Sequence, residues 1–489
     1  MIFHVLWGLR VFACIKSVER NLLGTEKLPK PFHSNVSRIA SAIKPRAADG
    51  TQQIVVYFGG IGALGTPQSR FEEAVTGNTM VYKIRYAYRV LMDNYTPGDK
   101  IFLFGYSRGA FTARAVVDFI RWVGILQKGS VDNFYSVWDE YRSVSKIFRD
   151  DLNSRPESQT LAALLGGGKG RVRDDIVCKD IKIRCVGVFD TVGSLKAPPL
   201  FVTFSDDLQI AEEARKRYDR FDIHLDPEVE NVFQAQALDE RRFDFYPAVL
   251  ERPVIGIQHF NQTWFPGVHA DMGGRTTTVL GLFPLAWMIG KLQAACLLDL
   301  DEDFVRHNIF DALVGADLRD KDDWRPSDLK ITPSHWIDRH TFIRSLIPSW
   351  LLPWTRIAHR NPHMAANATT SPQQQVAAPP NQGPEQTFHW TVINRINKPT
   401  GYWERNTTTK HFALTCTALR RPDPMNPNAQ ITKQQIEQRM DAPTGIDGDL
   451  YRHFNFRERM GNRMDQDAFG DQWTTPSNAT RTVRRRRRQ

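Results

Sequence analysis

The chain has 489 residues, of which 41% are hydrophobic and 24% are charged. These values are typical of a soluble globular protein and allow either one large catalytic domain with an appendage or two ordinary domains. The formal net charge is +10, but six of the positive charges belong to Arg481 and Arg484–Arg488, so we expect a solvated basic tail and no nucleic-acid partner, with a contact to nucleic acid or an anionic membrane as the alternative.

The cysteines are scattered along the chain and form no C-x-x-C pair. Their odd number and spacing argue against a disulfide framework and against a zinc knot. A reducing compartment, and hence a cytoplasmic location, is the simplest interpretation. The five residues concerned are Cys14, Cys178, Cys185, Cys296 and Cys416.

The N-terminal segment, residues 1–33, is atypical. Met1–Ile15 is apolar but carries His4 and Arg10, has no preceding basic residue and is too short to span a membrane. We expect a buried strand or helix there, with a targeting or membrane-surface segment as the alternative.

From about residue 34 to residue 125, helical and strand patterns alternate with short connections. Such alternation predicts a parallel sheet with crossover helices. The expected elements are a helix that starts at Ser34-Asn35 and runs to Ile43, a strand over Gln53–Phe58, a helix over Val81–Leu91, a strand over Lys100–Phe104 and a helix over Gly109–Ile125.

The pentapeptide Gly105-Tyr106-Ser107-Arg108-Gly109 lies between the second of these strands and the helix that follows it. A G-x-S-x-G motif in this position is the nucleophile elbow of α/β-hydrolases, in which glycines allow a very tight turn that exposes the serine. We therefore interpret Ser107 as a nucleophile and Gly105 and Gly109 as its supporting residues.

A serine nucleophile requires a histidine base and an acid, which follow it in the order acid, then histidine. Asp190 comes directly after an apolar run, Ile181–Phe189, and is the candidate acid; an aspartate that only caps a turn is the alternative. Asp239 and Glu240 compete, but their Leu-Asp-Glu-Arg-Arg context indicates a helix surface with local salt bridges.

His269 is the candidate base, because it lies in a loop rich in glycine and proline that is flanked by aromatic residues. A purely structural histidine is one alternative. Asp271 lies two residues later, and the two side chains together would also allow a metal site, which is the weaker alternative because no further cluster has ligand spacing.

The oxyanion of the reaction would be held by backbone N–H groups. The residue after the nucleophile, Arg108, supplies one of them, and Gly59 and Gly60, in the glycine-rich turn that ends at Gly62, are expected to supply another.

Four ordered motifs together resemble the catalytic domain of the type VI secretion lipase effectors, a family widespread in fungi as an uncharacterised hydrolase domain. The resemblance covers about residues 34–295 and implies an α/β-hydrolase fold, phospholipase-type acyl hydrolysis, and catalytic roles for Ser107, Asp190 and His269. The motifs are Ile101–Arg114, Gly187–Ser194, Ala237–Arg242 with Phe245 and Pro247, and Trp264–Gly274.

The chain departs from this family at its start. Members begin with a strand that ends in Phe-Asp-Gly-Thr, whereas residues 1–33 contain only Leu23-Gly24-Thr25, so a sheet strand is expected to be missing or replaced. The family often has histidine where Gln234 stands. The missing strand motivates an alternative, a catalytically inactive interaction protein with a hydrolase fold.

We expect an α/β-hydrolase-like fold, a mostly parallel sheet with helices on both faces, followed by a partly disordered C-terminal region. The expected function is serine-dependent acyl-ester hydrolysis of an ester or phospholipid, with transient contact to a membrane surface and no cofactor. The expected domains are the segment 1–33, a catalytic domain over 34–310, an appendage over 311–420 with a disordered insertion at 363–386, and a mostly disordered tail over 421–489.

Overall fold

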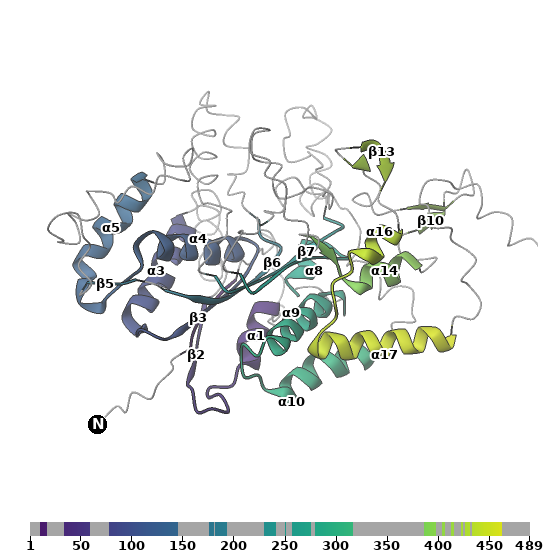
Figure 1. Ribbon diagram of the computed structural model, residues 1–489, viewed down its shortest axis with the longest axis horizontal. Coiled ribbons are helices and arrows are strands. Elements are labelled where there is room, and N and C mark those ends of the chain that lie inside the picture. The colour runs from purple at the N-terminus through teal and green to yellow at the C-terminus, as the bar shows by residue number, and fades with distance from the viewer. Residues whose placement is uncertain are drawn as a thin grey trace, which may run out of the picture.

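The structure is a computed structural model, and Figure 1 shows its arrangement. The predicted turn Gly59–Gly62, nearly all of the insertion at 363–386 and the arginine tail lie outside the residues that the structure describes. The described residues are 10–16, 34–58, 78–144, 176–179, 181–192, 229–240, 250, 257–274, 279–315, 386–397, 403–405, 412–414, 422–423, 426–430 and 433–461.

A seven-stranded sheet forms the centre of the molecule, and all of its neighbouring strands are parallel. The carboxyl ends of the strands therefore meet at one rim. In spatial order the strands are β2 (Gln53–Phe58), β1 (Arg10–Lys16), β3 (Lys100–Tyr106), β6 (Ile183–Phe189), β7 (Asn231–Ala237), β8 (His259–Phe265) and β9 (Thr387–Phe388).

The N-terminal segment, expected to hold a buried strand or helix, contains a strand over Arg10–Lys16, so the strand that was expected to be missing or replaced is replaced by one without the family motif. β1 lies between β2 and β3, with Ile15 opposite Phe58 on one side and Gly105 on the other. The Phe-Asp-Gly-Thr motif is not required for this position, because a strand in a parallel sheet needs only an extended, mostly apolar segment. The sheet is thus continuous from its edge to the elbow strand.

Helices cover both faces of the sheet, as predicted. The apolar side chains of β3 alternate between two cores, because Leu103 packs with one set of helices and Phe102 and Phe104 pack with the other. The first core contains α3 (Asn78–Asn94), α4 (Arg108–Val123) and α5 (Val131–Val144), and the second contains α1 (Asn35–Ala42), α9 (Leu282–Ala294) and α17 (Gly445–Gly461).

The C-terminal region differs most from the prediction. The segment expected to be an appendage supplies β9 of the central sheet, and the tail expected to be mostly disordered forms α16 (Lys433–Gln438) and α17. Ile446 and Leu450 of α17 are buried against α9. Its weak periodicity and high polarity obscured this helix, because the side chains that it buries find their partners far away in the sequence.

Shorter elements connect these parts or extend them. The α14 helix (Trp390–Asn397) follows β9 directly. The others are β4 (Ile125–Leu126), β5 (Val177–Cys178), α8 (His269–Met272), α10 (Glu302–Val305), α11 (Asp311–Gly315), β10 (Trp403–Arg405), β11 (Phe412–Leu414), β12 (Pro422–Asp423), β13 (Asn426–Gln430), the 3-10 turns Lys128–Ser130 and Val279–Gly281, and the π-helical turn Arg306–Phe310.

Candidate active site

Ser107 lies in a strained turn between β3 and α4. Its φ of 58° falls in the left-handed region, which non-glycine residues rarely adopt. The turn is so tight that a Cβ on Gly105 would lie 2.5 Å from the Cα of Ala110. The backbone N–H of Ser107 donates to the carbonyl of Phe189 at 3.0 Å, which fixes the turn to the next strand. These are the features of a nucleophile elbow.

Asp190 follows β6 at the same rim and also has a positive φ, 45°. Its backbone N–H donates to the carbonyl of Ala235 at 2.7 Å, and its Oδ1 accepts the N–H of Ala237 at 3.0 Å. Both partners belong to β7, so the neighbouring strand holds the carboxylate. Its other oxygen, Oδ2, is left to face His269.

His269 begins α8, four residues after the end of β8, and its imidazole lies between the other two side chains. Its Nδ1 is 2.6 Å from Asp190 Oδ2, and its Nε2 is 2.8 Å from Ser107 Oγ. All three residues are buried, with at most 2% of their surface exposed. The three residues selected from the sequence thus form one continuous hydrogen-bonded chain.

The side chain of Tyr106, for which the sequence indicated no role, packs against this histidine. The two rings stack with centroids 4.8 Å apart, and the tyrosine hydroxyl donates to the carbonyl of His269 at 3.0 Å. The residue before the nucleophile therefore fixes both the ring and the backbone of His269. Position 106 is variable in the G-x-S-x-G pattern, so the motif gave no signal for it.

The expectation that Asp239 and Glu240 lie on a helix surface is wrong. Both residues are buried in the turn after β7. Asp239 Oδ2 accepts the N–H of Gly267 at 2.7 Å, and Glu240 Oε2 accepts the N–H of His269 at 3.2 Å. The two carboxylates hold the segment that carries the histidine, because free backbone N–H groups in a buried loop need acceptors.

Asp271, the other half of the alternative metal pair, bonds within its own turn. Its Oδ2 accepts the N–H of Val268 at 2.8 Å and caps the start of α8. Among the described residues, no group of three or more His, Cys, Asp or Glu side chains is arranged to hold a metal ion.

Arg108 is the first residue of α4, so its backbone N–H belongs to the N-terminal turn of a sixteen-residue helix. Such N–H groups have no acceptor within the helix and favour a negative charge nearby. The position suits the predicted oxyanion donor. Gly59 and Gly60, the other predicted donors, lie outside the described residues.

A row of buried amides extends away from Asp190 across the sheet. The hydroxyl of Thr191 donates to Gln234 Oε1 at 2.7 Å, and Gln234 Nε2 donates to Gln262 Oε1 at 3.1 Å. Gln262 also accepts the N–H of Leu250 at 2.7 Å. Gln234, where the family often has histidine, thus links β7 to β8 and to the residue that follows Asp190.

Cys185 and Cys178, two cysteines whose side chains the structure describes, are poor competitors of Ser107 as nucleophiles. Burial raises the pKa of the Cys185 thiol on β6 far above its usual range, so this group stays protonated. Burial also raises the pKa of Cys178. The Ser107 hydroxyl, in contrast, has the imidazole of His269 within hydrogen-bonding distance.

In the part of the chain that the structure describes, no helix is long and apolar enough to cross a membrane.

Comparison with known proteins gives one family match. The model of the family described as "T6SS, Phospholipase effector Tle1-like, catalytic domain" matches residues 21–291, which is more than half of the chain. Uncharacterized protein YEL023C of Saccharomyces cerevisiae is 27% identical over 206 residues, covering 39% of this chain and 28% of that protein.

Two solved structures are also similar. One is the Tle1 effector bound to the VgrG spike from the type 6 secretion system, at 16% identity and a TM-score of 0.30, with 56% of this chain and 52% of that chain covered. The other is an uncharacterized protein from Pseudomonas aeruginosa, at 14% identity and a TM-score of 0.30, with 61% and 47% covered. The chain therefore spans less than a third of the yeast relative and about half of each of these two.

Proposed function

The chain belongs to the family of Tle1-like phospholipase effector catalytic domains, and from this premise we propose that it is a serine-dependent acyl-ester hydrolase of the phospholipase type. The observation that carries the proposal is the chain of contacts from Ser107 Oγ through His269 to Asp190, at 2.8 and 2.6 Å. A hydroxyl, a base and an orienting acid in this order are the requirements for nucleophilic acyl transfer.

The reaction would begin when Ser107 Oγ attacks the carbonyl carbon of the ester while His269 Nε2 takes the hydroxyl proton. Asp190 keeps the proton of His269 on Nδ1 and stabilises the imidazolium. The tetrahedral oxyanion would be held by the N–H of Arg108, together with a donor from the Gly59–Gly60 turn. His269 then returns the proton to the leaving alcohol, an acyl-enzyme remains on Ser107, and water releases the acid by the same route.

The substrate class follows from the family, whose description names a phospholipase effector. We assign the chain an acyl ester of a lipid, reached by transient contact with a membrane surface, and a cytoplasmic location. The proposed location is supported by the scattered cysteines, which are compatible with a reducing compartment.

The direct test compares wild type with Ser107→Ala in the hydrolysis of short p-nitrophenyl esters and of phospholipid vesicles. The variant removes one hydroxyl and should fold normally, which circular dichroism and the melting temperature check. We expect hydrolysis in wild type and its loss in the variant. Equal hydrolysis by both would refute the role of Ser107, and a folded wild type inactive on every ester would favour the alternative, an interaction protein with a hydrolase fold.

A further inference from the structure

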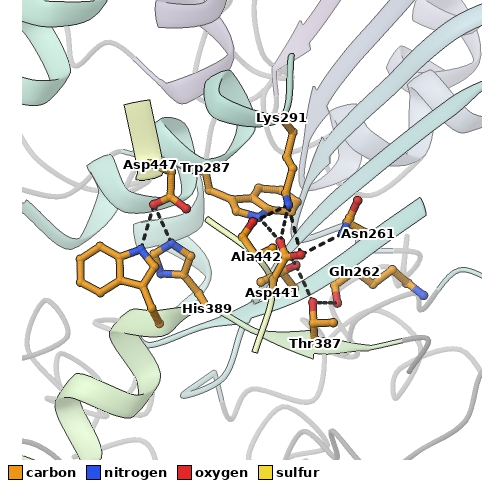
Figure 2. A network of polar contacts seen from close by, with 11 residues as sticks. Asn261, Gln262, Trp287, Lys291, Thr387, His389, Asp441, Ala442 and Asp447 are labelled. Atoms are coloured by element: carbon orange, nitrogen blue, oxygen red, sulfur yellow. Dashed lines mark hydrogen bonds and ion pairs between the residues drawn. The ribbon is translucent and has the colours of Figure 1, made fainter. Parts of the chain in front are cut away.

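A buried carboxylate joins the C-terminal segment to the catalytic part of the fold. Asp441 precedes α17, and its side chain accepts hydrogen bonds from Trp287 Nε1 at 2.6 Å and from Asn261 Nδ2 at 2.9 Å (Figure 2). The hydroxyl of Thr263 donates to it at 3.3 Å, and Lys291 Nζ lies 3.0 Å from it. One side chain thus collects partners from β8 and from α9.

The ion pair between Asp441 and Lys291 is buried, with 6% and 7% of these residues exposed. Lys291 Nζ also donates to the carbonyl of Ala442 at 3.0 Å. Removing one partner of a buried pair leaves the other charge without compensation, which is strongly unfavourable. Lys291 is also the last residue matched by the family model, so its charge is balanced by a residue outside the matched range.

The backbone reinforces this junction. The N–H of Asp441 donates to the carbonyl of Phe388 at 2.9 Å, next to the place where β9 pairs with β8. Gly290 of α9 approaches the chain after Asp441 so closely that a Cβ there would lie 2.2 Å from the carbonyl oxygen of Thr444. The backbone of the segment that carries Asp441 is therefore held from two directions.

A second contact reaches the end of β8. The ring of His389 stacks on Phe265, the last residue of β8, with centroids 4.4 Å apart, and its backbone N–H donates to the carbonyl of Trp264 at 2.9 Å. Asp447 Oδ1 lies 3.0 Å from His389 Nε2 and accepts the Trp390 indole N–H at 3.0 Å. Figure 2 shows His389 and Asp447 in the same view as Asp441 and its partners.

β8 leads directly to His269, four residues after Phe265. Its Asn261 and Thr263 side chains are the ones that bond Asp441. We propose that Asp441 is a positioning residue for the hydrolase: by holding β8 against α9, it keeps His269 in line between Ser107 and Asp190. This role rests on the proposed function, and it makes the C-terminal segment part of the catalytic unit although the family match ends before it.

The test distinguishes a positioning role from a folding role by normalising the activity to the number of reactive serines. The full-length protein, as wild type, Asp441→Asn and Asp441→Ala, is titrated with a fluorophosphonate to give the number of reactive serines, and kcat per reactive serine and KM are measured on a p-nitrophenyl ester below each melting temperature. Val137→Ala is the matched control, because it truncates a buried residue of α5 in the other core.

We expect kcat per reactive serine to fall about tenfold or more in Asp441→Ala and less in Asp441→Asn, since small misplacements of catalytic groups lower rates strongly. KM should stay within about twofold, because Asp441 lies away from the reacting atoms. Val137→Ala should lower the melting temperature and leave kcat per reactive serine unchanged. A wild-type value in both Asp441 variants would overturn the proposal, because a merely structural residue changes only the number of folded molecules.

If neither Asp441 variant folds, Asn261→Ala provides the same comparison, because it removes one half-buried donor on β8 and leaves the ion pair intact. A smaller fall in kcat per reactive serine supports the proposal, and no fall contradicts it. Failure of the proposed function has a different signature: the wild type itself neither reacts with the fluorophosphonate nor hydrolyses the ester.

Discussion

The described part of the chain contains two buried histidine–aspartate pairs, and their surroundings give them different roles. His269 binds Asp190 through Nδ1 at 2.6 Å and presents Nε2 to the hydroxyl of Ser107. His389 binds Asp447 through Nε2 at 3.0 Å, and its Nδ1 lies 2.7 Å from the hydroxyl of Thr391, two residues along the chain. Each imidazole therefore contacts one carboxylate and one hydroxyl.

What separates the pairs is their place in the sheet. The first pair lies at the rim where parallel strands end, and its hydroxyl stands on a strained elbow that aims it at the histidine. In the second pair the hydroxyl belongs to the first turn of α14, and the histidine is enclosed by Phe265 and Trp390 at the sheet edge. The same side-chain chemistry is therefore present in both pairs, and their different places in the fold distinguish the candidate catalytic pair from the structural one.

The largest effect should come from His269→Gln. Glutamine keeps an N–H for Asp190 but cannot act as a base, so we expect kcat to fall on the order of a millionfold, as in other serine hydrolases that lose this histidine. Ester hydrolysis measures the fall, and the melting temperature verifies the fold. Loss of less than about a hundredfold would mean that another group serves as the base.

Next in size is Asp190→Asn. The amide would donate to Nδ1 and favour the wrong imidazole tautomer, so we expect kcat to fall on the order of ten-thousandfold with KM nearly unchanged. Steady-state kinetics provides the two constants. Activity close to that of wild type would show that Asp190 only caps its turn, the alternative that the sequence left open.

The matched change in the second pair, His389→Gln, should act on stability. It weakens the bond to Asp447 and the stack on Phe265, so we expect the free energy of unfolding to fall by about 2 kcal/mol. Urea denaturation measures the loss. The rate per reactive serine should change far less than in His269→Gln, and equal losses of rate in the two variants would erase the distinction between the pairs.

Tyr106→Phe should give the smallest effect. It removes the hydroxyl that donates to the carbonyl of His269 and keeps the stacked ring, so we expect a loss of about 1 kcal/mol in stability and a fall in kcat of about fivefold or less. Tyr106→Ala, which also removes the ring, should cost clearly more activity. Identical rates in the two variants would place the contribution in the hydroxyl alone.

Local signals made the elbow, Asp190 and His269 predictable. A serine flanked by glycines between a strand and a helix predicts a tight turn, and Asp190 follows a mostly apolar strand. These features depend only on neighbouring residues in the sequence. The ends of the predicted strands and the order serine, acid, histidine were therefore enough to select the three residues.

The rest depended on partners far away in the chain. β7 reads as Asn-Val-Phe-Gln-Ala-Gln-Ala, and its glutamine at position 234 is buried only because Thr191 and Gln262 pair with it. β1 lacks the expected motif, and Asp441 stands in a polar region whose partners are on β8 and α9. No local pattern encodes such pairings, so the C-terminal segment was predicted as disordered.

The proposed function depends above all on Ser107 being a nucleophile that His269 activates. The most direct measurement incubates the folded wild-type chain with a fluorophosphonate and maps the adduct by peptide mass spectrometry, with Ser107→Ala and His269→Gln in parallel. We expect one phosphonylated peptide, modified at Ser107, no adduct in Ser107→Ala, and a strongly slowed reaction in His269→Gln. A folded wild type that remains unmodified, or an adduct on another residue, would contradict it.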